Sequence, residues 1–471
     1  MKKIILIEKT VVFTRLAILL DNQLITTYID SNLNPDDQNK VVVGQIDKVV
    51  KNLNAAFVDY GDEKKGLLHL LQVPAMYKGK MNQGVRLPIQ IVKQNEGEKG
   101  HKLTAKINIK GKYLVCLPFE EGISISKKIK NQALRKKLKE RLVQIASAKY
   151  GFIVRTHAEY VAIEDIEEDA KGLVKQVDHL MKVKDNLSKG AVLFKEPPMY
   201  SQVVAENLNI HDEIEIICND LETGRLLEEE LKEYRERGYI VQIICIDQKE
   251  ELFQIYDIQK VINNLLSRKI WLKNGGNIII DYTEALTVID VNSAKAILSN
   301  NHKKAVNELN QLAIKEALLQ ILRRNLSGII IVDLIEMPDL EDKEQAYLYA
   351  KNMIAQYGDK RTNVFPITEL GLLQISRSKK YNSVPVKLLK TCEQCKYPQG
   401  EYSLEYNAYL IEKRIKHTAF QTTNTQITVQ CSQDIIDFFS QNHLKQSLED
   451  KYGIKIDLIK MEKGLKDKFL C

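Results

Sequence analysis

The chain has 471 residues, of which 44% are hydrophobic and 28% are charged, and its formal net charge is +7. This length predicts roughly three to four domains, and the ordinary composition excludes a largely disordered protein. No apolar run approaches the roughly 20 residues that a membrane-spanning helix needs, so we expect no membrane span.

The N-terminal segment, residues 1–35, predicts two or three strands. Residues 2–7 begin like a signal peptide, but Glu8 and Lys9 then interrupt the apolar run. We therefore expect a first β-strand and a cytoplasmic protein. Residues 41–116 follow as short apolar runs separated by glycine and charged turns, which is typical of a small barrel such as an OB-fold.

The segment 127–141 carries eight lysines and arginines and one acidic residue, Glu140. It could present a phosphate-binding patch, and a solvated helix face explains it equally well. A strand at 151–156 and a long helix at about 165–189 follow. Pro197-Pro198 marks a domain boundary.

Two apolar runs in the middle of the chain each contain an aspartate. Residues 286–292 contain Asp290, and residues 328–336 contain Asp333. Both runs predict buried strands, and the helix expected between them, at about 303–324, would let them lie side by side. A carboxylate is costly to bury, so the pair either caps turns at the strand ends or binds a cation. Carboxylates with an asparagine nearby are the oxygen ligands that Mg²⁺ prefers, and Mg²⁺ commonly serves chemistry on phosphates.

Cys392 and Cys395 form a CxxC motif, which supplies only two thiolates to a metal. The chain has seven cysteines, and an odd number in a long chain that we expect to be cytosolic argues against a disulfide framework. No second CxxC or CxxH in the sequence completes a tetrahedral site, which argues against a zinc-ribbon translation factor. The motif is therefore half of a zinc site shared by two protomers, or redox-active, or inert.

Four segments resemble the ribonuclease E/G family of bacterial endoribonucleases, and the resemblance extends over nearly the whole chain. Three of them match the family's nuclease core in order and approximate spacing: 284–293, 326–337 and 369–377. The fourth, 54–61, is similar to the family's inserted S1-type OB-fold. The length is similar to that of the shorter, ribonuclease G-like members.

The resemblance implies an α/β multidomain fold. Its expected parts, in chain order, are an RNase H-like framework (1–36), an S1-type OB-fold (37–116), a 5′-sensor (117–199), the second part of the RNase H-like framework (200–270), a DNase I-like catalytic domain (271–388), a zinc link (389–402) and a small α/β domain (403–471).

The resemblance also assigns catalysis to Asp290, Asn292 and Asp333. The two aspartates match the family's Mg²⁺-binding pair. Asn292 lies two residues beyond Asp290 on a strand and so shares its face, and it matches an asparagine that helps orient the phosphate or a water. Cys392 and Cys395 match the family's Zn²⁺ link, in which two subunits share one ion, so we expect a homodimer or homotetramer.

RNA binding is assigned in the same way. Arg155 and Thr156 match a pocket for the RNA 5′-monophosphate, where a guanidinium gives bidentate contacts and a hydroxyl adds a third. A backbone amide of the segment Gly122-Ile123-Ser124 could complete this cradle, and Arg361 matches an arginine that supports it. Weaker candidates for phosphate contacts, for which a surface role is equally acceptable, are Arg324, Arg377 and Lys379.

Phe57 matches a base-stacking position of the OB-fold, although its apolar neighbours also fit a core residue. Leu67 stands where the family has a second aromatic residue. Either the binding of single-stranded RNA is therefore weaker than in the family, or Tyr60 and the loop containing Lys99 carry it.

Together these matches predict a Mg²⁺-dependent endoribonuclease, specific for single-stranded RNA, that acts in rRNA maturation and mRNA turnover. The resemblance further implies stimulation by a 5′-monophosphate and products with 5′-phosphate and 3′-hydroxyl ends. The alternative is a non-catalytic RNA-binding or assembly factor with a vestigial nuclease site. The joint presence of Asp290, Asn292 and Asp333 favours the enzyme.

Overall fold

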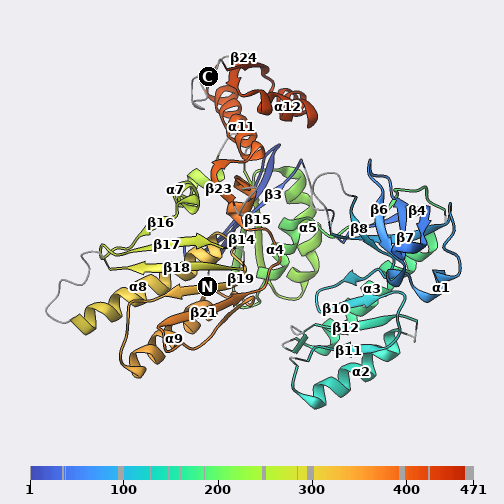
Figure 1. Cartoon of the computed structure of the whole chain (residues 1–471), viewed down its shortest axis with the longest axis horizontal. Helices are drawn as coiled ribbons and strands as arrows, with labels where there is room; N and C mark the ends of the chain where they lie inside the picture. The colour runs from blue at the N-terminus through green and yellow to red at the C-terminus, as the bar shows by residue number, and fades with distance from the viewer. Residues whose placement is uncertain are drawn as a thin grey trace. The chain divides into compact units, whose positions relative to one another are not determined.

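A computed structural model shows a mixed α/β chain with several separate sheets, as the sequence predicts (Figure 1). It describes residues 2–33, 37, 39–93, 100–127, 129–146, 149–155, 158–159, 161–184, 186–246, 251–283, 285–293, 302–391, 398–422 and 425–461. The chain forms two compact units. One combines Met1–Pro35 with Pro198–Cys471, and the other is Asp36–Pro197.

A five-stranded sheet joins the N-terminus of the chain to its middle. In spatial order its strands are β15 (Ile240–Cys245), β14 (Glu213–Cys218), β1 (Lys2–Lys9), β2 (Phe13–Leu20) and β3 (Gln23–Ser31). Helices α4 (Met199–Asn207) and α5 (Leu221–Glu236) pack on one face, where Leu227 contributes to the same core as Ile5. β1 pairs in parallel with β14 and is apolar on both faces because both faces are covered.

A six-stranded sheet forms the second layer of this unit. In spatial order its strands are β16 (Lys269–Trp271), β17 (Asn277–Tyr282), β18 (Leu286–Asn292), β19 (Gly328–Asp333), β21 (Leu372–Arg377) and β20 (Thr362–Val364). Helices α8 (His302–Arg323) and α9 (Leu340–Gln356) run along one face of the sheet (Figure 1). α8 is the crossover between the parallel strands β18 and β19, and buried residues such as Ile314 and Leu318 hold it against the sheet.

The C-terminal part of the first unit contains short strands and helices that pack on the five-stranded sheet. Their bounds are α6 (Leu252–Ile255), α7 (Gln259–Asn263), α10 (Val384–Leu388), β22 (Leu389–Thr391), β23 (Pro398–Tyr402), α11 (Leu404–Gln421), β24 (Gln426–Cys431), α12 (Gln433–Gln441), α13 (Leu444–Tyr452) and β25 (Lys455–Lys460). The buried Glu412 carboxylate of α11 accepts hydrogen bonds from the backbone N–H groups of Val11 and Val12. This contact fixes α11 to the N-terminal strands.

The second unit contains a closed five-stranded barrel, the strand number of an OB-fold. Its strands, in order around the barrel, are β4 (Val41–Val50), β5 (Ala55–Asp59), β6 (Gly66–His69), β8 (Lys102–Thr104) and β7 (Arg86–Lys93), and β7 pairs with β4 to close it. β13 (Val192–Phe194) adds at β4, and α1 (Ala75–Lys78) precedes β7. Gly44 faces the interior, where a Cβ would come within 2.7 Å of Val58 Cγ1, so a larger residue would not fit.

A four-stranded sheet completes the second unit. Its strands in spatial order are β11 (Ile123–Ile125), β12 (Gly151–Val154), β10 (Leu114–Leu117) and β9 (Ile109–Lys110), with helices α2 (Gln132–Ala146) and α3 (Ile163–Val183) packed on them. The sequence placed the barrel at 37–116. The structure differs there, because the last barrel strand, β8, ends at Thr104, and the next two strands belong to the four-stranded sheet, where β10 pairs with both β9 and β12.

Candidate active site

The six-stranded sheet has one covered face and one open face. Along β18 the side chains alternate, so Ile289 and Val291 are buried on the side of α8 while Asp290 and Asn292 point to the opposite side. On β19 the same alternation leaves Asp333 exposed. The three predicted catalytic residues therefore lie on the open face.

Strand register places the two aspartates next to each other. Asp290 of β18 is the direct partner of Asp333 of β19 in the parallel pairing. Neighbouring strands are about 4.8 Å apart, so the two carboxylates leave the sheet side by side. Asn292 Nδ2 donates a hydrogen bond to Asp290 Oδ2 at 2.7 Å. The structure thus brings together Asp290, Asn292 and Asp333.

The charge balance of this pair leaves room for a cation. Two basic groups of this unit pair with other carboxylates, Arg268 with Asp281 and Lys303 with Asp339, and Lys269 lies two strands away from Asp290 in the register. Two like charges side by side on neighbouring strands destabilise each other unless a cation compensates them. The pair is therefore a suitable place for a positive ion.

Asp290, Asp333 and Asn292 offer oxygen donors, the kind that Mg²⁺ takes in proteins. Among the residues that the structure describes, no group of three or more His, Cys, Asp or Glu side chains is arranged to hold a metal. Mg²⁺ is commonly bound by one or two carboxylates and completes its shell with water and substrate phosphates. Asp290 and Asp333 supply those carboxylates.

A buried asparagine of α8 supports the segment that follows Asp333. Asn310 is 1% exposed, and its side chain forms two hydrogen bonds with the backbone of Ile335. At the other end of β19, Gly328 has φ +93°, a conformation that favours glycine. These two features fix the start and the end of the strand that carries Asp333.

The predicted stacking residue lies on the outside of the barrel. Phe57 is half-buried, while its neighbours Ala56 and Val58 are in the barrel core. Across the strands, Phe57 is paired with Lys48 on one side and Leu67 on the other, and Leu67 is paired with Lys102. We call Lys48, Phe57, Leu67 and Lys102 the barrel row. Phe57 is therefore not a core residue, and its ring is flanked by a leucine and two lysines.

Tyr60, which the sequence suggested as a further contact for RNA, is 6% exposed. Its hydroxyl donates to Asp62 at 2.6 Å, and burial is the main reason that its pKa is raised above the usual value. It is a core residue of the barrel and not an open stacking surface.

Arg155 follows the end of β12 and is exposed. Its guanidinium donates hydrogen bonds to the carbonyl oxygens of Gly111 and Lys112 at 3.1 and 3.3 Å. Gly122, by contrast, precedes the parallel strand β11 and lies at the start of β12, where its carbonyl accepts from the Phe152 N–H. The structure does not bring Gly122 and Arg155 together, because they lie at opposite ends of the same strand pair.

The arginines of the first unit are mostly structural. Arg324 is 1% exposed and donates to Gln320, Tyr282 and the Ser267 carbonyl. Arg377 is 2% exposed and forms an ion pair with Asp359. The suggestion that these two residues contact phosphate is therefore wrong, because their guanidinium groups are buried and already paired. Lys379 is exposed.

Arg361, like Arg377, forms an ion pair with Asp359. Its guanidinium contacts Asp359, Asn325 and the Tyr28 hydroxyl. Burial alone would raise the pKa of Asp359, but the charges of Arg377 and Arg361 hold it below its usual value. The proposed role of Arg361 in supporting a phosphate pocket stays a prediction.

Four predicted site residues lie outside the described residues: Lys99, Thr156, Cys392 and Cys395. For the two cysteines the flanking strands are described. β22 and β23 pair antiparallel, with Leu389 opposite Tyr402.

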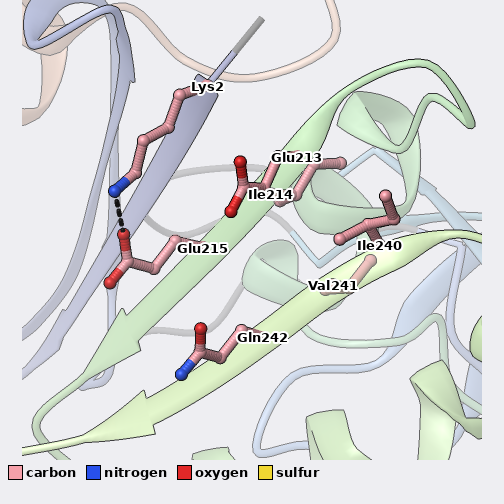
Figure 2. Close-up of a pocket in the computed structure, with 7 residues that line it drawn as sticks. All are labelled: Lys2, Glu213, Ile214, Glu215, Ile240, Val241 and Gln242. Carbon is pink, nitrogen blue, oxygen red and sulfur yellow. Dashed lines mark ion pairs between the residues drawn. The ribbon is translucent and has the colours of Figure 1, made fainter.

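The pocket drawn in Figure 2 is a different place from the candidate site. It lies at the start of the parallel strands β1, β14 and β15, where Lys2 forms an ion pair with Glu215 at 3.1 Å. None of the predicted site residues lines it. We therefore assign the chemistry to the open sheet face, where the carboxylates are.

The sequence analysis missed Asn310. An asparagine within an apolar helix is a signal that could have identified it, because a buried amide needs hydrogen-bond partners. It also missed the exposed residues of β16, which are described below. In the described part of the chain, no helix has the length and apolar character that crossing a bilayer requires.

Comparison with known proteins agrees with the resemblance seen in the sequence. The model of the Ribonuclease E/G family matches residues 108–380. Ribonuclease G of Salmonella typhimurium is 27% identical over 412 residues, which cover 83% of each chain. Ribonuclease G of Haemophilus influenzae is 24% identical over 444 residues, which cover 90% of this chain and 89% of that relative. Ribonuclease E of Synechocystis sp. is 28% identical over 368 residues, 75% of this chain. The match spans about half (54%) of that longer relative.

Proposed function

Because the chain belongs to the ribonuclease E/G family, we propose that it is an endoribonuclease that cuts single-stranded RNA at the carboxylate pair of β18 and β19 with a divalent cation. The observation that carries this proposal is the register of Asp290 with Asp333 on an open sheet face. The printed names of the relatives support an activity on RNA.

Each residue of the site has a defined part in this proposal. Asp290 and Asp333 would hold Mg²⁺, and Asn292 fixes the orientation of the Asp290 carboxylate through its 2.7 Å hydrogen bond. The chemistry that such an ion would supply is a lower pKa for a bound water and compensation of the negative charge on the scissile phosphate. Hydrolysis would leave a 5′-phosphate on one product and a 3′-hydroxyl on the other.

We assign RNA binding and end recognition to the second unit. The barrel, which we take to be an S1-type OB-fold, would stack a base on Phe57 between its flanking lysines. Arg155 would exchange its carbonyl partners for the RNA 5′-monophosphate, with which a guanidinium forms stronger, charge-assisted hydrogen bonds. A 5′-monophosphate would then stimulate cutting, and Thr156 and Arg361 would assist.

The remaining parts of the proposal concern assembly. We take the sheet of β1 and β14 as an RNase H-like framework and the six-stranded sheet as a DNase I-like nuclease domain. Cys392 and Cys395 would each give a thiolate to a Zn²⁺ shared with a second subunit, forming a dimer or tetramer. Metal analysis should then find about one zinc per two chains, and one per chain would contradict sharing. We expect the enzyme to act in the cytoplasm on rRNA and mRNA.

The test is cleavage of a single-stranded RNA with Mg²⁺ or with EDTA, with the product ends mapped and a duplex of the same sequence as control. We expect cutting of the single strand only, dependent on Mg²⁺, with 5′-phosphate products. RNA binding without any cutting would favour a non-catalytic RNA-binding factor, and cutting in EDTA would contradict the metal site.

A further inference from the structure

The open face of the six-stranded sheet carries the single tryptophan of the chain. Trp271 of β16 is 65% exposed. It lies opposite Asn277 of β17, and Asn277 lies opposite Asn292 of β18, so the three residues form one row across three strands. Ile270, between Lys269 and Trp271, packs toward the core of α8 and α9, which places Trp271 on the same face as Asp290.

The separation of Trp271 from the carboxylates suits a neighbouring nucleotide. Two strand spacings separate Trp271 from Asn292, which is about 10 Å between their backbones. A base next to a phosphate held at Asp290 could reach across that distance.

A lysine lies against the same ring. Lys269 Nζ is 4.1 Å from the centre of the Trp271 ring. In the strand register Lys269 is opposite Ile279, which is opposite Asp290. The row therefore offers a flat aromatic surface and a positive charge, the two features that proteins use to bind single-stranded nucleic acid.

Asn277, the middle residue of the row, has an unusual environment. It is 4% exposed, and its Oδ1 accepts no hydrogen bond from the described residues. Folded proteins rarely leave such an atom unpaired, because an unpaired buried acceptor costs free energy. A donor that arrives with a ligand would remove this cost.

We propose that Trp271, Lys269 and Asn277 form a nucleotide subsite beside the cutting centre. Trp271 stacks on a base next to the scissile phosphate and Lys269 binds the adjoining phosphate. The Asn277 side chain turns on binding, so that its Oδ1, which is screened from solvent in the free chain, receives a hydrogen bond from the nucleotide. The proposal rests on the proposed function, because it takes RNA as the substrate at Asp290 and Asp333.

Fluorescence tests the subsite directly, because Trp271 is the chain's one tryptophan. The full chain is titrated in EDTA with a short single-stranded RNA whose 2′-hydroxyls are methylated, so that nothing is cut. Binding is followed at the same time by the anisotropy of a label on the RNA. We expect emission to be quenched and to saturate with the same Kd as the anisotropy, and an RNA with abasic residues to bind without quenching.

Single substitutions test the contribution of each of the three side chains to RNA binding. Trp271→Ala should weaken RNA binding by about 5- to 150-fold, while Trp271→Phe keeps most of the affinity. Lys269→Gln should lower the salt dependence of binding by about 0.7 in the log–log slope. Asn277→Leu should weaken binding without lowering the melting temperature, since it removes an unpaired polar atom. Ile240→Ala, 62% exposed on the five-stranded sheet, is the matched control and should leave binding unchanged.

The outcomes distinguish this subsite from the proposed function. Cutting that depends on Asp290, together with RNA binding that leaves tryptophan emission unchanged, overturns the subsite alone. Quenching by RNA when Asp290→Asn still cuts would support the subsite and contradict the proposed cutting centre. Trp271 emission could instead change with protein concentration and not with RNA. That result would assign the Trp271 ring to a contact between copies of the chain and would overturn the subsite.

Discussion

The open face of the six-stranded sheet and the barrel row present similar surfaces with different charges. Each has one aromatic ring beside lysine: Trp271 with Lys269 on the sheet, and Phe57 with Lys48 and Lys102 on the barrel. Only the sheet face adds carboxylates in register, Asp290 and Asp333. The proposed functions differ accordingly: both surfaces would bind RNA, and the one that can also hold a cation would cut it.

The largest effect is expected when one of the two carboxylates of the sheet face is neutralised. Asp290→Asn or Asp333→Asn should slow single-turnover cleavage roughly a thousandfold, because several kcal/mol of charge stabilisation are lost. RNA binding, measured by anisotropy, should be retained. Asp281→Asn is the control, since Asp281 faces the same side of the sheet but is paired with Arg268. Equal losses in all three variants would show that general destabilisation, and not cation binding, is responsible.

A second test addresses the RNA end. Arg155→Ala should reduce the preference for 5′-monophosphorylated over 5′-hydroxyl RNA roughly 10- to 150-fold, the value of one or two charge-assisted hydrogen bonds. The measurement compares initial rates on the two matched RNAs. Arg86→Ala provides the control, because Arg86 is an exposed arginine of the same unit whose guanidinium also donates to a carbonyl oxygen, that of Leu187. No preference in the wild type would contradict an end-sensing role for Arg155.

A third test concerns the barrel row. Phe57→Ala should raise the Kd for single-stranded RNA about 5- to 150-fold, since a stacked base contributes roughly 1–3 kcal/mol. Phe57→Tyr should bind like the wild type. Leu67→Phe should bind more tightly, because Leu67 is the direct cross-strand neighbour of Phe57 and a second ring would extend the platform. Leu53→Ala, exposed on the same unit, should be neutral, and the barrel row is not an RNA surface if Phe57→Ala is neutral as well.

The smallest effect concerns the support of Asp333. Asn310→Leu leaves the backbone N–H and carbonyl of Ile335 without their buried partner, so we expect the free energy of unfolding to fall by about 1–3 kcal/mol. Cleavage should slow as the strand end loosens. Denaturant unfolding measures the first effect, with Gln311→Leu, at an exposed position of the same helix, as the control. Unchanged stability would mean that Asn310 does not hold this segment.

The local pattern of the sequence was enough to predict the strands that carry Asp290 and Asp333. The apolar runs around Asp290 and Asp333 predicted buried strands, and the helix between them predicted a parallel crossover. Register then followed from the fold, since a slip by one residue would have turned the aspartates to the covered face. Strand order in the rest of the chain was harder, because the residues from Ile109 to Leu117 look like barrel strands until their partner β12 is known.

Residues whose role depends on distant partners could not be placed from the sequence. Arg324 and Arg377 looked like surface cations, but their partners Tyr282 and Asp359 come from other strands and loops. Gly122 looked close to Arg155 in a phosphate cradle, and the parallel pairing of β11 with β12 separates them. Trp271 could be seen as an isolated aromatic residue, but only the sheet register puts it in the row of Asn292.

One measurement tests the central claim that Asp333 and Asp290 hold the cation used in cutting. Asp333→Cys replaces an oxygen ligand by a thiolate, which prefers softer metals to Mg²⁺. If Asp333 holds the cation, this variant should cut poorly with Mg²⁺ and regain activity with Cd²⁺, when both rates are normalised to the wild type in the same metal. Equal relative rates in the two metals would show that Asp333 does not contact the cation.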